Sequence, residues 1–289
     1  MENKGSTGDD AMILAAESFR EYGEMYGQMI NDWTPISPGP GWVLLNSPLV
    51  YLNCFYLITP LYLALLLFVL WKSKESNNLM NEVFIFIALG AVFWELLLNG
   101  HDIPALSFSF FILTYLFLRK VDKIADWKFI LLSILLGFVC TSRVVFMVFP
   151  FIWLFIGWKQ NQRNSLLAFV ISIVVASGLH LVFYQQSPNY QPFHLLGKAE
   201  LILGKYLLVV FALVFIFGMF KFLVTSKIRQ SIIRIALVLS AILVPISYAD
   251  WVRVDFDFSL WEGANYVLPL VPFYVYYLVK EKEQQKNLI

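Results

Sequence analysis

Two adjacent carboxylates near the N-terminus, Asp9 and Asp10, are the residues best placed by type and spacing to do chemistry. Gly8 before them favours a turn, and an Asp at this point can cap a helix by accepting backbone N–H bonds. Four apolar residues then share one face at helical spacing, namely Met12, Ile13, Ala16 and Phe19. The pattern predicts a short amphipathic helix that lies on a membrane surface. Because two acids are more than one cap needs, the pair is the best candidate reactive site, with a structural cap as the alternative.

Arg143 is the best candidate cation. It follows Ser142 between two apolar segments, and a guanidinium binds a phosphate through two parallel hydrogen bonds. A structural pair between Arg143 and a carboxylate is the alternative. Arg253 is a weaker candidate of the same kind.

Two further polar pairs are candidate binding residues. His101-Asp102 follows the turn signal Asn99-Gly100, so these side chains either form a tight polar turn or contact a substrate or a metal ion. Trp261-Glu262 lies in a later polar loop, where the tryptophan is either part of an interfacial aromatic belt or a contact to substrate.

Other polar and reactive residues lie in or beside apolar runs. A carboxylate inside a membrane usually faces a cavity or a partner, so both a functional role and a buried ion pair stay open for Glu95. We predict that His180 is a core histidine and that His194 lies in a loop where it can meet substrate. Cys54 and Cys140 give neither a disulfide framework nor a metal-ligand spacing.

The elements that must position these residues are mostly apolar. The chain has 289 residues, of which 59% are hydrophobic and 14% charged, and its mean hydropathy is +0.70. A soluble domain averages about 25% charged residues, so the composition indicates an integral membrane protein, and a net charge of +1 gives no sign of nucleic-acid binding. We predict an all-α, polytopic transmembrane helical bundle with about nine apolar segments. They cover residues 48–71, 81–98, 103–118, 129–141, 144–158, 165–184, 201–223, 231–248 and 264–279.

Basic residues fall on alternate loops, which is the pattern expected when they mark the cytoplasmic side. They are Lys72, Lys74, Arg119, Lys120, Lys123, Lys128, Lys159, Arg163, Lys227, Arg229, Lys280, Lys282 and Lys286. The alternation holds only if the fourth and fifth segments are separate short helices that meet at Arg143. It places five segments outside the cytoplasm: 1–47, 99–102, 141–143, 185–200 and 250–265.

The predicted organisation therefore has three regions. Residues 1–47 form an extracytoplasmic loop with the amphipathic juxtamembrane helix, residues 48–279 form the transmembrane helical domain, and residues 280–289 form a cytoplasmic tail. No signal peptide or apolar segment precedes the first region in the sequence, so we expect a first transmembrane helix to be missing from this chain.

Together these features resemble the GT-C class of membrane glycosyltransferases. The resemblance rests on the Gly8-Asp9-Asp10 loop, the surface helix, and the turn Pro38-Gly39-Pro40-Gly41 that leads into a span. It also rests on the Ser142-Arg143 step before an apolar helix with Pro150, and on Glu262-Gly263-Ala264-Asn265-Tyr266 ahead of Pro269 and Pro272. In that class the first outer loop follows a first helix, and this chain departs from the pattern there.

The resemblance implies sugar transfer on the extracytoplasmic face, in the plasma membrane of a prokaryote. The donor would be a polyprenyl-phosphate sugar, and the acceptor a glycan, lipid or protein. Asp9 or Asp10 would take the acceptor proton. Cationic side chains such as Arg143, or a divalent cation (Mg²⁺ or Mn²⁺), would hold the leaving phosphate. The residues implied to contact substrate are His101, Asp102, Arg143, Arg253, Trp261 and Glu262, with Trp261 stacking on a sugar ring.

Two other classes remain as alternatives. Broken helices and the intramembrane Glu95 also fit a multi-pass transporter or flippase for a lipid or a small solute, although no internal repeat pairs the two halves of the chain. The third interpretation is a non-catalytic membrane scaffold. The sequence distinguishes neither the base, between Asp9 and Asp10, nor the sugar and its acceptor.

Overall fold

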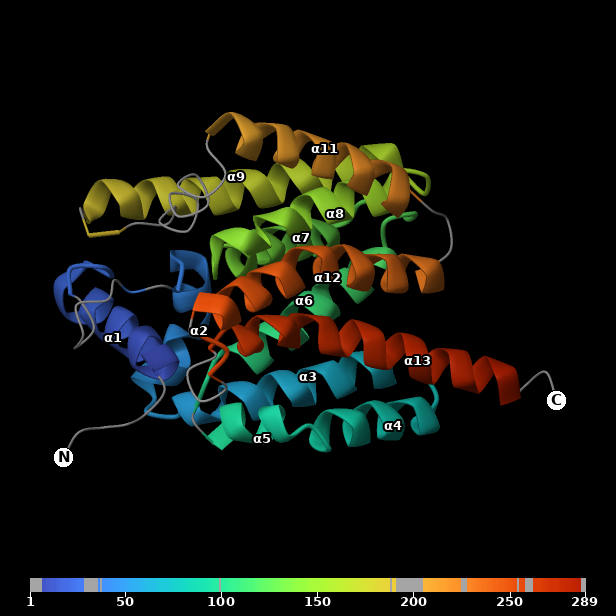
Figure 1. Cartoon of the computed structure of the whole chain (residues 1–289), viewed down its shortest axis with the longest axis horizontal. Helices are drawn as coiled ribbons and strands as arrows, with labels where there is room; N and C mark the ends of the chain where they lie inside the picture. Colours follow the sequence, from blue (N-terminus) through green and yellow to red (C-terminus); the bar gives the residue numbers. More distant parts are fainter. Residues whose placement is uncertain are drawn as a thin grey trace. The chain divides into compact units, whose positions relative to one another are not determined.

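A computed structural model of the chain describes residues 7–28, 36, 38–98, 100–187, 189–190, 205–224, 228–253, 255–257 and 262–286. These residues form twelve α-helices and three 3-10 helices, with no strand among them. The prediction of an all-α fold is therefore confirmed (Figure 1). The chain divides into two compact units, each built from two stretches of sequence. Unit 1 contains Met1–Phe55 and Leu116–Ser226, and unit 2 contains Tyr56–Tyr115 and Lys227–Ile289.

Unit 1 is built around three closely packed helices, α7 (Trp127–Cys140), α8 (Val148–Gly157) and α9 (Gln162–Gln186). Helices α7 and α8 both pack on α9. A Cβ added at Gly137 of α7 would lie 2.8 Å from the Ser172 carbonyl oxygen of α9. This glycine therefore lets the two backbones approach closely, as small residues do between helices in membranes. The other helices of unit 1 are α1 (Thr7–Tyr22), α2 (Pro40–Tyr51), the 3-10 helix η2 (Val144–Met147) and α11 (Lys205–Leu223).

Unit 2 combines two helical stretches. The first contains α3 (Ile58–Lys72), α4 (Asn77–Ala88), α5 (Ala91–Leu98) and α6 (Ile103–Leu118), the last of which belongs to this unit as far as Tyr115. The second contains α12 (Ile228–Arg253), the 3-10 helix η3 (Glu262–Leu270) and α13 (Val271–Lys286). Helix α13 packs on α4 and on α12, and η3 packs on α12. The short 3-10 helix η1 (Phe55–Leu57) lies at the boundary of the two units.

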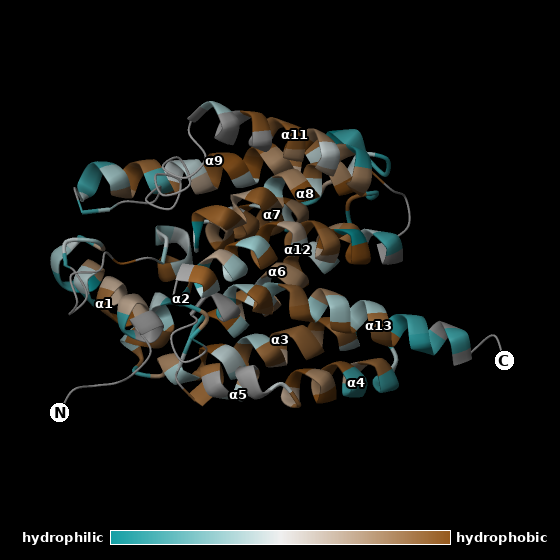
Figure 2. Ribbon diagram, viewed as in Figure 1, coloured by the Kyte–Doolittle hydropathy of each residue, from teal (hydrophilic) through white to brown (hydrophobic). Residues whose placement is uncertain are grey.

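Among the described residues, three helices are long and apolar enough to cross a membrane: Phe55–Lys72, Gln162–Gln186 and Gln230–Val252. Shorter apolar helices cover Ile103–Leu118, Trp127–Cys140, Val144–Gly157 and Leu213–Leu223. Figure 2 shows that α9 is hydrophilic at its ends and hydrophobic along its middle. Its middle carries a stripe of exposed apolar side chains, Leu166, Val170, Val174 and Leu181. A long helix with such a stripe suits a lipid environment, which agrees with a membrane protein. The full set of nine crossings stays a prediction.

The location of helix α1 on a membrane surface stays a prediction, and part of its apolar face packs inside the protein. It buries Ala11, Met12, Ala15 and Ala16, and it packs on α2. The Tyr51 hydroxyl donates a hydrogen bond to the Ala16 carbonyl oxygen at 3.2 Å, and the Arg20 guanidinium lies 5.4 Å from the centre of the Tyr51 ring. The helix begins at Thr7, so Asp9 and Asp10 occupy its first turn rather than its N-cap. Carboxylates there interact favourably with the helix dipole.

The ends of two elements also differ from the predicted regional boundaries. Helix α2 begins at Pro40, eight residues before position 48, because proline at N1 is preorganised for the start of a helix. Helix α13 continues to Lys286, so most of the predicted tail at 280–289 is helical.

Candidate functional site

The helix break predicted at Arg143 is present in unit 1. Helix α7 ends at Cys140, and η2 begins at Val144. Arg143 occupies the N-cap of η2 in an extended conformation, with φ −149° and ψ 142°, and its carbonyl oxygen accepts a hydrogen bond from Phe146 N–H at 2.9 Å. The prediction of two short helices that meet at Arg143 is confirmed. The guanidinium turns back to donate from Nη1 to the Ser142 carbonyl oxygen at 2.8 Å.

The Pro-Gly run that precedes α2 packs directly on this break. Gly39 N–H donates to the Ser142 carbonyl oxygen at 3.2 Å, and Trp42 N–H donates to Thr141 Oγ1 at 3.1 Å. A Cβ at Gly39 would lie only 1.7 Å from the Thr141 carbonyl oxygen, and one at Gly41 would lie 2.7 Å from the Phe138 carbonyl oxygen. Both glycines are therefore required by close backbone contact. The Pro-Gly run positions the turn that carries Arg143.

The chain between α1 and α2 contributes a buried tyrosine next to this turn. Tyr26 is 2% exposed and donates a hydrogen bond to the Pro38 carbonyl oxygen at 2.8 Å. Its ring stacks on Tyr190, with centroids 4.1 Å apart, and meets Phe183 of α9 edge-on at 6.1 Å. Burial raises the pKa of Tyr26 well above its ordinary value and also raises the pKa of Tyr190, while the positive charge of Arg143 opposes the rise at Tyr26. Both phenols are therefore neutral at physiological pH.

The tyrosine pair continues to His180 on α9. The Tyr190 hydroxyl and His180 Nδ1 are 2.5 Å apart, and the two rings lie nearly parallel. If Nδ1 accepts a hydrogen bond from the Tyr190 hydroxyl, Nε2 carries a hydrogen and is a donor. If Nδ1 donates instead, Nε2 is an acceptor. His180 Nε2 is buried and has no hydrogen-bond partner among the residues that the structure describes, so one polar position of the ring could bind a ligand or a water in either tautomer.

Two serine hydroxyls in unit 1 are in the same situation as His180 Nε2. Ser142 Oγ and Ser187 Oγ are buried and have no hydrogen-bond partner within the described part of the chain, and their residues are 0% and 2% exposed. Ser142 lies at the helix break, and Ser187 follows α9 and accepts a hydrogen bond from Tyr190 N–H at its carbonyl oxygen. Buried polar atoms in proteins almost always have partners. We refer to Tyr26, Ser142, His180, Ser187 and Tyr190 as the Tyr26 cluster.

The sequence identified Arg143 but not most of this cluster. It predicts His180 as a core histidine, which agrees with its packing against Tyr190 but misses the unpartnered Nε2. Tyr190 and Ser187 carry no motif of their own, and their partners are far away in the sequence. The one usable signal is that segments 1–47, 141–143 and 185–200 are all assigned to the same side of a membrane.

The predicted acids are also placed in unit 1. Asp10 is exposed in the first turn of α1, and Asp9 belongs to the same turn, although its side chain lies outside the described residues. The shared cavity that the sequence predicts for these acids and Arg143 stays a prediction. What the structure does show is that α1 and the Arg143 turn both pack against α2.

The remaining predicted site residues belong to unit 2. His101 Nδ1 lies 3.2 Å from Asp102 Oδ1 and accepts a hydrogen bond from Ile103 N–H. The His101 carbonyl oxygen accepts one from Thr59. Asp102 is completely buried, and Gly100 has a φ of +68° that suits the turn before α6. The pair thus forms a tight polar turn, and a contact to substrate stays a prediction.

Arg253, Glu262 and Glu95 have no described side chain, although each belongs to a described helix. Arg253 is the last residue of α12, Glu262 is the first residue of η3, and Glu95 lies in α5. Trp261 and His194 lie outside the described residues. Within the described part of the chain, no group of three His, Cys, Asp or Glu side chains is arranged to hold a metal ion.

No protein-family model matches the chain, and no curated protein or solved structure is significantly similar to it.

Proposed function

We propose that the chain is a polytopic membrane glycosyltransferase of the GT-C type, which moves a sugar from a polyprenyl-phosphate-linked donor to an acceptor on the extracytoplasmic side. The observation that carries the proposal is a set of three buried polar atoms in the Tyr26 cluster to which no described residue hydrogen-bonds: Ser142 Oγ, His180 Nε2 and Ser187 Oγ. Burying such atoms costs free energy unless something hydrogen-bonds to them. The oxygens of a phosphate ester would accept from the serine hydroxyls, while Arg143 supplies the positive charge.

Contacts within unit 1 support the predicted alternation of loops. In unit 1, three segments assigned to the outer side touch one another: Tyr26 stacks on Tyr190, and Gly39 binds Ser142. At the other end of that unit, Asn164 Nδ2 donates to the backbone carbonyls of the loop between α6 and α7. Each set of contacts joins only segments assigned to one side, as a membrane-spanning arrangement requires.

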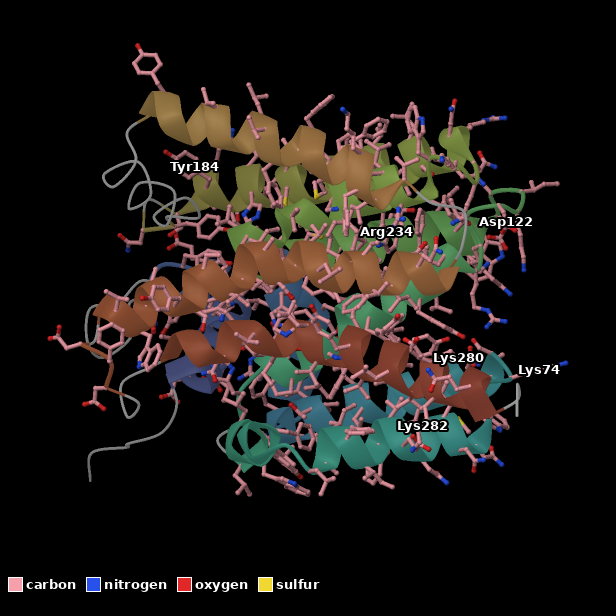
Figure 3. The ribbon with its side chains drawn as sticks, turned by 45° about the vertical axis from the view of Figure 1, so that its right-hand side comes forward. Lys74, Asp122, Tyr184, Arg234, Lys280 and Lys282 are labelled. Carbon is pink, nitrogen blue, oxygen red and sulfur yellow. The ribbon has the colours of Figure 1, made fainter. Side chains whose placement is uncertain are left out.

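Figure 3 illustrates the same separation. In unit 1, Tyr184 near the end of α9 and Asp122 in the loop after α6 lie at opposite ends. In unit 2, Lys74, Lys280 and Lys282, all assigned to the cytoplasmic side, gather at one end. Within unit 1, Asp122 belongs to the loop that carries Arg119, Lys120 and Lys123, so the positive-inside rule orients the Tyr26 cluster at the other end of that unit away from the cytoplasm. Nucleotide sugars are not available there, whereas a lipid-linked donor reaches the site through the bilayer.

The proposed roles follow from the chemistry of the transfer. The acceptor hydroxyl attacks the anomeric carbon, the bond from that carbon to the phosphate oxygen breaks, and the lipid phosphate leaves with the electron pair. Arg143 stabilises the charge on the leaving phosphate. Asp9 or Asp10 takes the acceptor proton. Asp10 suits this role because it is exposed and therefore accessible to an acceptor, on a helix that shares the α2 scaffold with the Arg143 turn.

The test is the binding of a short-chain polyprenyl monophosphate to purified protein in detergent, measured together with thermal stability. Arg143→Lys keeps the charge but loses the bidentate geometry, and Arg143→Gln loses both. We expect affinity to fall in the order Arg, Lys, Gln without loss of folding. Arg163→Gln is the matched control, because Arg163 is an exposed arginine at the start of α9, and it should bind as the unmodified protein does.

Two outcomes would contradict the proposed phosphate site. Unchanged binding by a well-folded Arg143→Gln protein would remove Arg143 from the site. A large loss of stability in Arg143→Gln with unchanged binding would indicate a structural ion pair, because removing one partner leaves a buried charge. Movement of the lipid across a vesicle without any sugar transfer would favour the transporter or flippase.

A further inference from the structure

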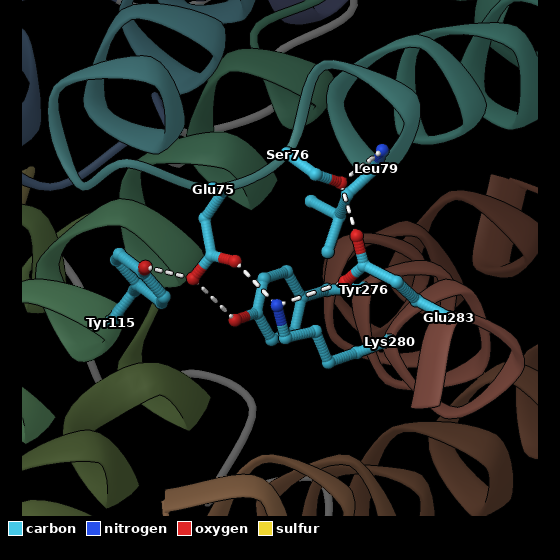
Figure 4. Close-up of polar contacts among 7 residues, drawn as sticks. All are labelled: Glu75, Ser76, Leu79, Tyr115, Tyr276, Lys280 and Glu283. Carbon is cyan, nitrogen blue, oxygen red and sulfur yellow. Dashed lines mark hydrogen bonds and ion pairs between the residues drawn. The ribbon is translucent and has the colours of Figure 1, made fainter. Parts of the chain in front are cut away.

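The end of unit 2 that carries Lys74 and Lys280 contains a dense group of polar contacts (Figure 4). Glu75, in the turn between α3 and α4, accepts hydrogen bonds at Oε1 from the hydroxyls of Tyr115 at 2.6 Å and Tyr276 at 3.0 Å. Its Oε2 lies 2.7 Å from Lys280 Nζ. We refer to Glu75, Ser76, Tyr115, Tyr276, Lys280 and Glu283 as the Glu75 clasp.

A second pair of contacts extends the clasp by one turn of α13. The Ser76 hydroxyl donates to Glu283 Oε1, and Ser76 Oγ also caps α4 by accepting from Leu79 N–H at 3.1 Å. Lys280 Nζ lies 3.0 Å from Glu283 Oε2 and so joins the two pairs. Tyr276, Lys280 and Glu283 have the spacing i, i+4, i+7, which places them on one face of α13. Glu75 and Ser76, which are consecutive in the sequence, thus contact side chains on successive helical turns of α13.

Two backbone hydrogen bonds and one left-handed residue fix the turn that carries Glu75. Glu75 N–H donates to the Leu70 carbonyl oxygen, Lys74 N–H donates to the Trp71 carbonyl oxygen, and Lys74 has a φ of +59°. This pattern is a Schellman motif, in which glycine usually occupies the left-handed position. A lysine there is strained, and the surrounding contacts must maintain it.

The charges of the clasp reinforce one another. Burial alone would raise the pKa of Glu75, but the hydrogen bonds from Lys280 and Tyr115 outweigh it and lower that pKa below its ordinary value. Burial of Lys280 opposes its charge, yet the two glutamates raise its pKa. The Glu75 side chain is 9% exposed and Lys280 is 28% exposed, so this pair is better shielded from water than the Lys282–Glu82 pair between α13 and α4.

The apolar contacts of α13 specify its position along α6 much less sharply. Phe273 and Tyr276 meet Phe111 through ring contacts at 5.2 and 5.4 Å. In lipid, apolar surfaces gain little by choosing one another over lipid tails, so packing alone discriminates weakly between helix positions. A shift of α13 by one turn, about 5.4 Å, that brings Pro269 and Pro272 to the positions of Phe273 and Tyr276 would keep an apolar surface against α6. The same shift would separate Glu75 from Lys280 and Ser76 from Glu283.

We propose that the Glu75 clasp is a register lock, which fixes the position of α13 along α4 and α6 and keeps this end of unit 2 closed. Its main effect is to select one helix register rather than to add stability, which is the best-attested use of buried polar groups. The lock is independent of the proposed sugar transfer, because it lies entirely within unit 2 and uses none of the site residues assigned above.

The test is cysteine cross-linking between α4 and α13. In a Cys54→Ser/Cys140→Ala background, Glu82→Cys is combined in turn with Leu278→Cys, Lys282→Cys or Lys286→Cys and treated with a short thiol-reactive cross-linker. Because Lys282 Nζ lies 3.0 Å from Glu82 Oε2, the pair 82/282 should react preferentially. We expect at least about tenfold selectivity over positions 278 and 286, equivalent to about 1.4 kcal/mol.

The clasp is then removed by Glu75→Gln/Lys280→Met/Glu283→Gln, which leaves no buried charge without a partner. We expect selectivity to fall below about threefold, or about 0.65 kcal/mol, as α13 samples neighbouring registers. The control is Lys120→Met/Asp126→Asn, which removes an exposed ion pair of unit 1 and should leave selectivity unchanged.

Selectivity that persists after removal of the clasp would overturn the proposal and assign the register to apolar packing. If the triple variant does not fold, Tyr115→Phe/Tyr276→Phe becomes the test, because it removes two hydrogen bonds and keeps the ion pair. Selectivity at the unmodified level in that variant would overturn the proposal equally.

Discussion

Replacing Gly39 by alanine should distort the turn that carries Arg143. Gly39 has φ −78° and ψ 161°, which any residue can adopt, so the whole effect is steric. Its Cβ would lie 1.7 Å from the Thr141 carbonyl oxygen, about half of an ordinary non-bonded contact. Backbone lies on both sides of this contact, so no side chain can move aside to relieve it.

The magnitude follows from two losses. Forcing an extra methyl into a packed site costs about 1–3 kcal/mol. Separating the backbones breaks the hydrogen bond from Gly39 N–H to the Ser142 carbonyl oxygen, worth about 0.5–1.5 kcal/mol. We therefore expect Gly39→Ala to lower the free energy of unfolding by about 1.5–4.5 kcal/mol and to weaken binding of a polyprenyl phosphate.

The assay is thermal or denaturant unfolding in detergent, with Gly178→Ala as the matched control. Gly178 lies in α9, and a Cβ there would have nothing within 4 Å. Alanine at such a helical position should be neutral or stabilise by about 0.5–1 kcal/mol. Equal stability of the two variants would refute the close backbone contact at Gly39.

Three further predictions concern other parts of the fold. Lys74→Gly should raise the free energy of unfolding by about 1 kcal/mol, because it relieves a left-handed residue, and a lower unfolding midpoint would contradict the strain. The contribution of the Glu75–Lys280 pair to the free energy of unfolding should be present at neutral pH. It should be lost as the pH falls through the lowered pKa of Glu75 in the folded protein, and lost again as the pH rises through the raised pKa of Lys280. The test is to measure the free energy of unfolding of the unmodified protein and of Glu75→Gln/Lys280→Met across this pH range. A difference between the two proteins that does not change with pH would contradict the prediction. Asn164→Ala should lower the free energy of unfolding by about 1–3 kcal/mol, because Nδ2 donates to two backbone carbonyls of the α6–α7 loop. Limited proteolysis should then cut that loop faster, and an unchanged cleavage rate would count against the contact.

Much of the fold could be predicted because apolar composition and length determine helices directly. Residues 103–118 were expected to be an apolar segment and form α6. The break at Arg143 was inferred from the alternation of basic loops, a constraint that acts on the whole chain. The packing of α1 on α2 was not predicted, because an amphipathic face does not reveal whether it meets lipid or protein.

The site could be predicted from the sequence only where residues adjacent in the chain indicate its chemistry. Arg143 can be identified because a basic residue between two apolar segments is unusual unless it has a functional or structural role. The Tyr26 cluster does not, because Tyr26 and Tyr190 are ordinary tyrosines until the fold stacks them. The Glu75 clasp was hidden for a related reason: Glu75 and Lys280 look like members of two solvated charged segments, and only the position of α13 brings them together.

The central claim is that the Tyr26 cluster and Arg143 hold the phosphate of a lipid-linked donor. It is tested most directly by photo-crosslinking with a polyprenyl phosphate that carries a photoreactive group next to the phosphate, followed by mapping of the labelled peptides. If they hold it, label is expected on the segments around Ser142-Arg143 and Ser187–Tyr190. Unlabelled polyprenyl phosphate should compete with this labelling, and Arg143→Gln should strongly reduce it. Label confined to other segments, or undiminished in a folded Arg143→Gln protein, would contradict it.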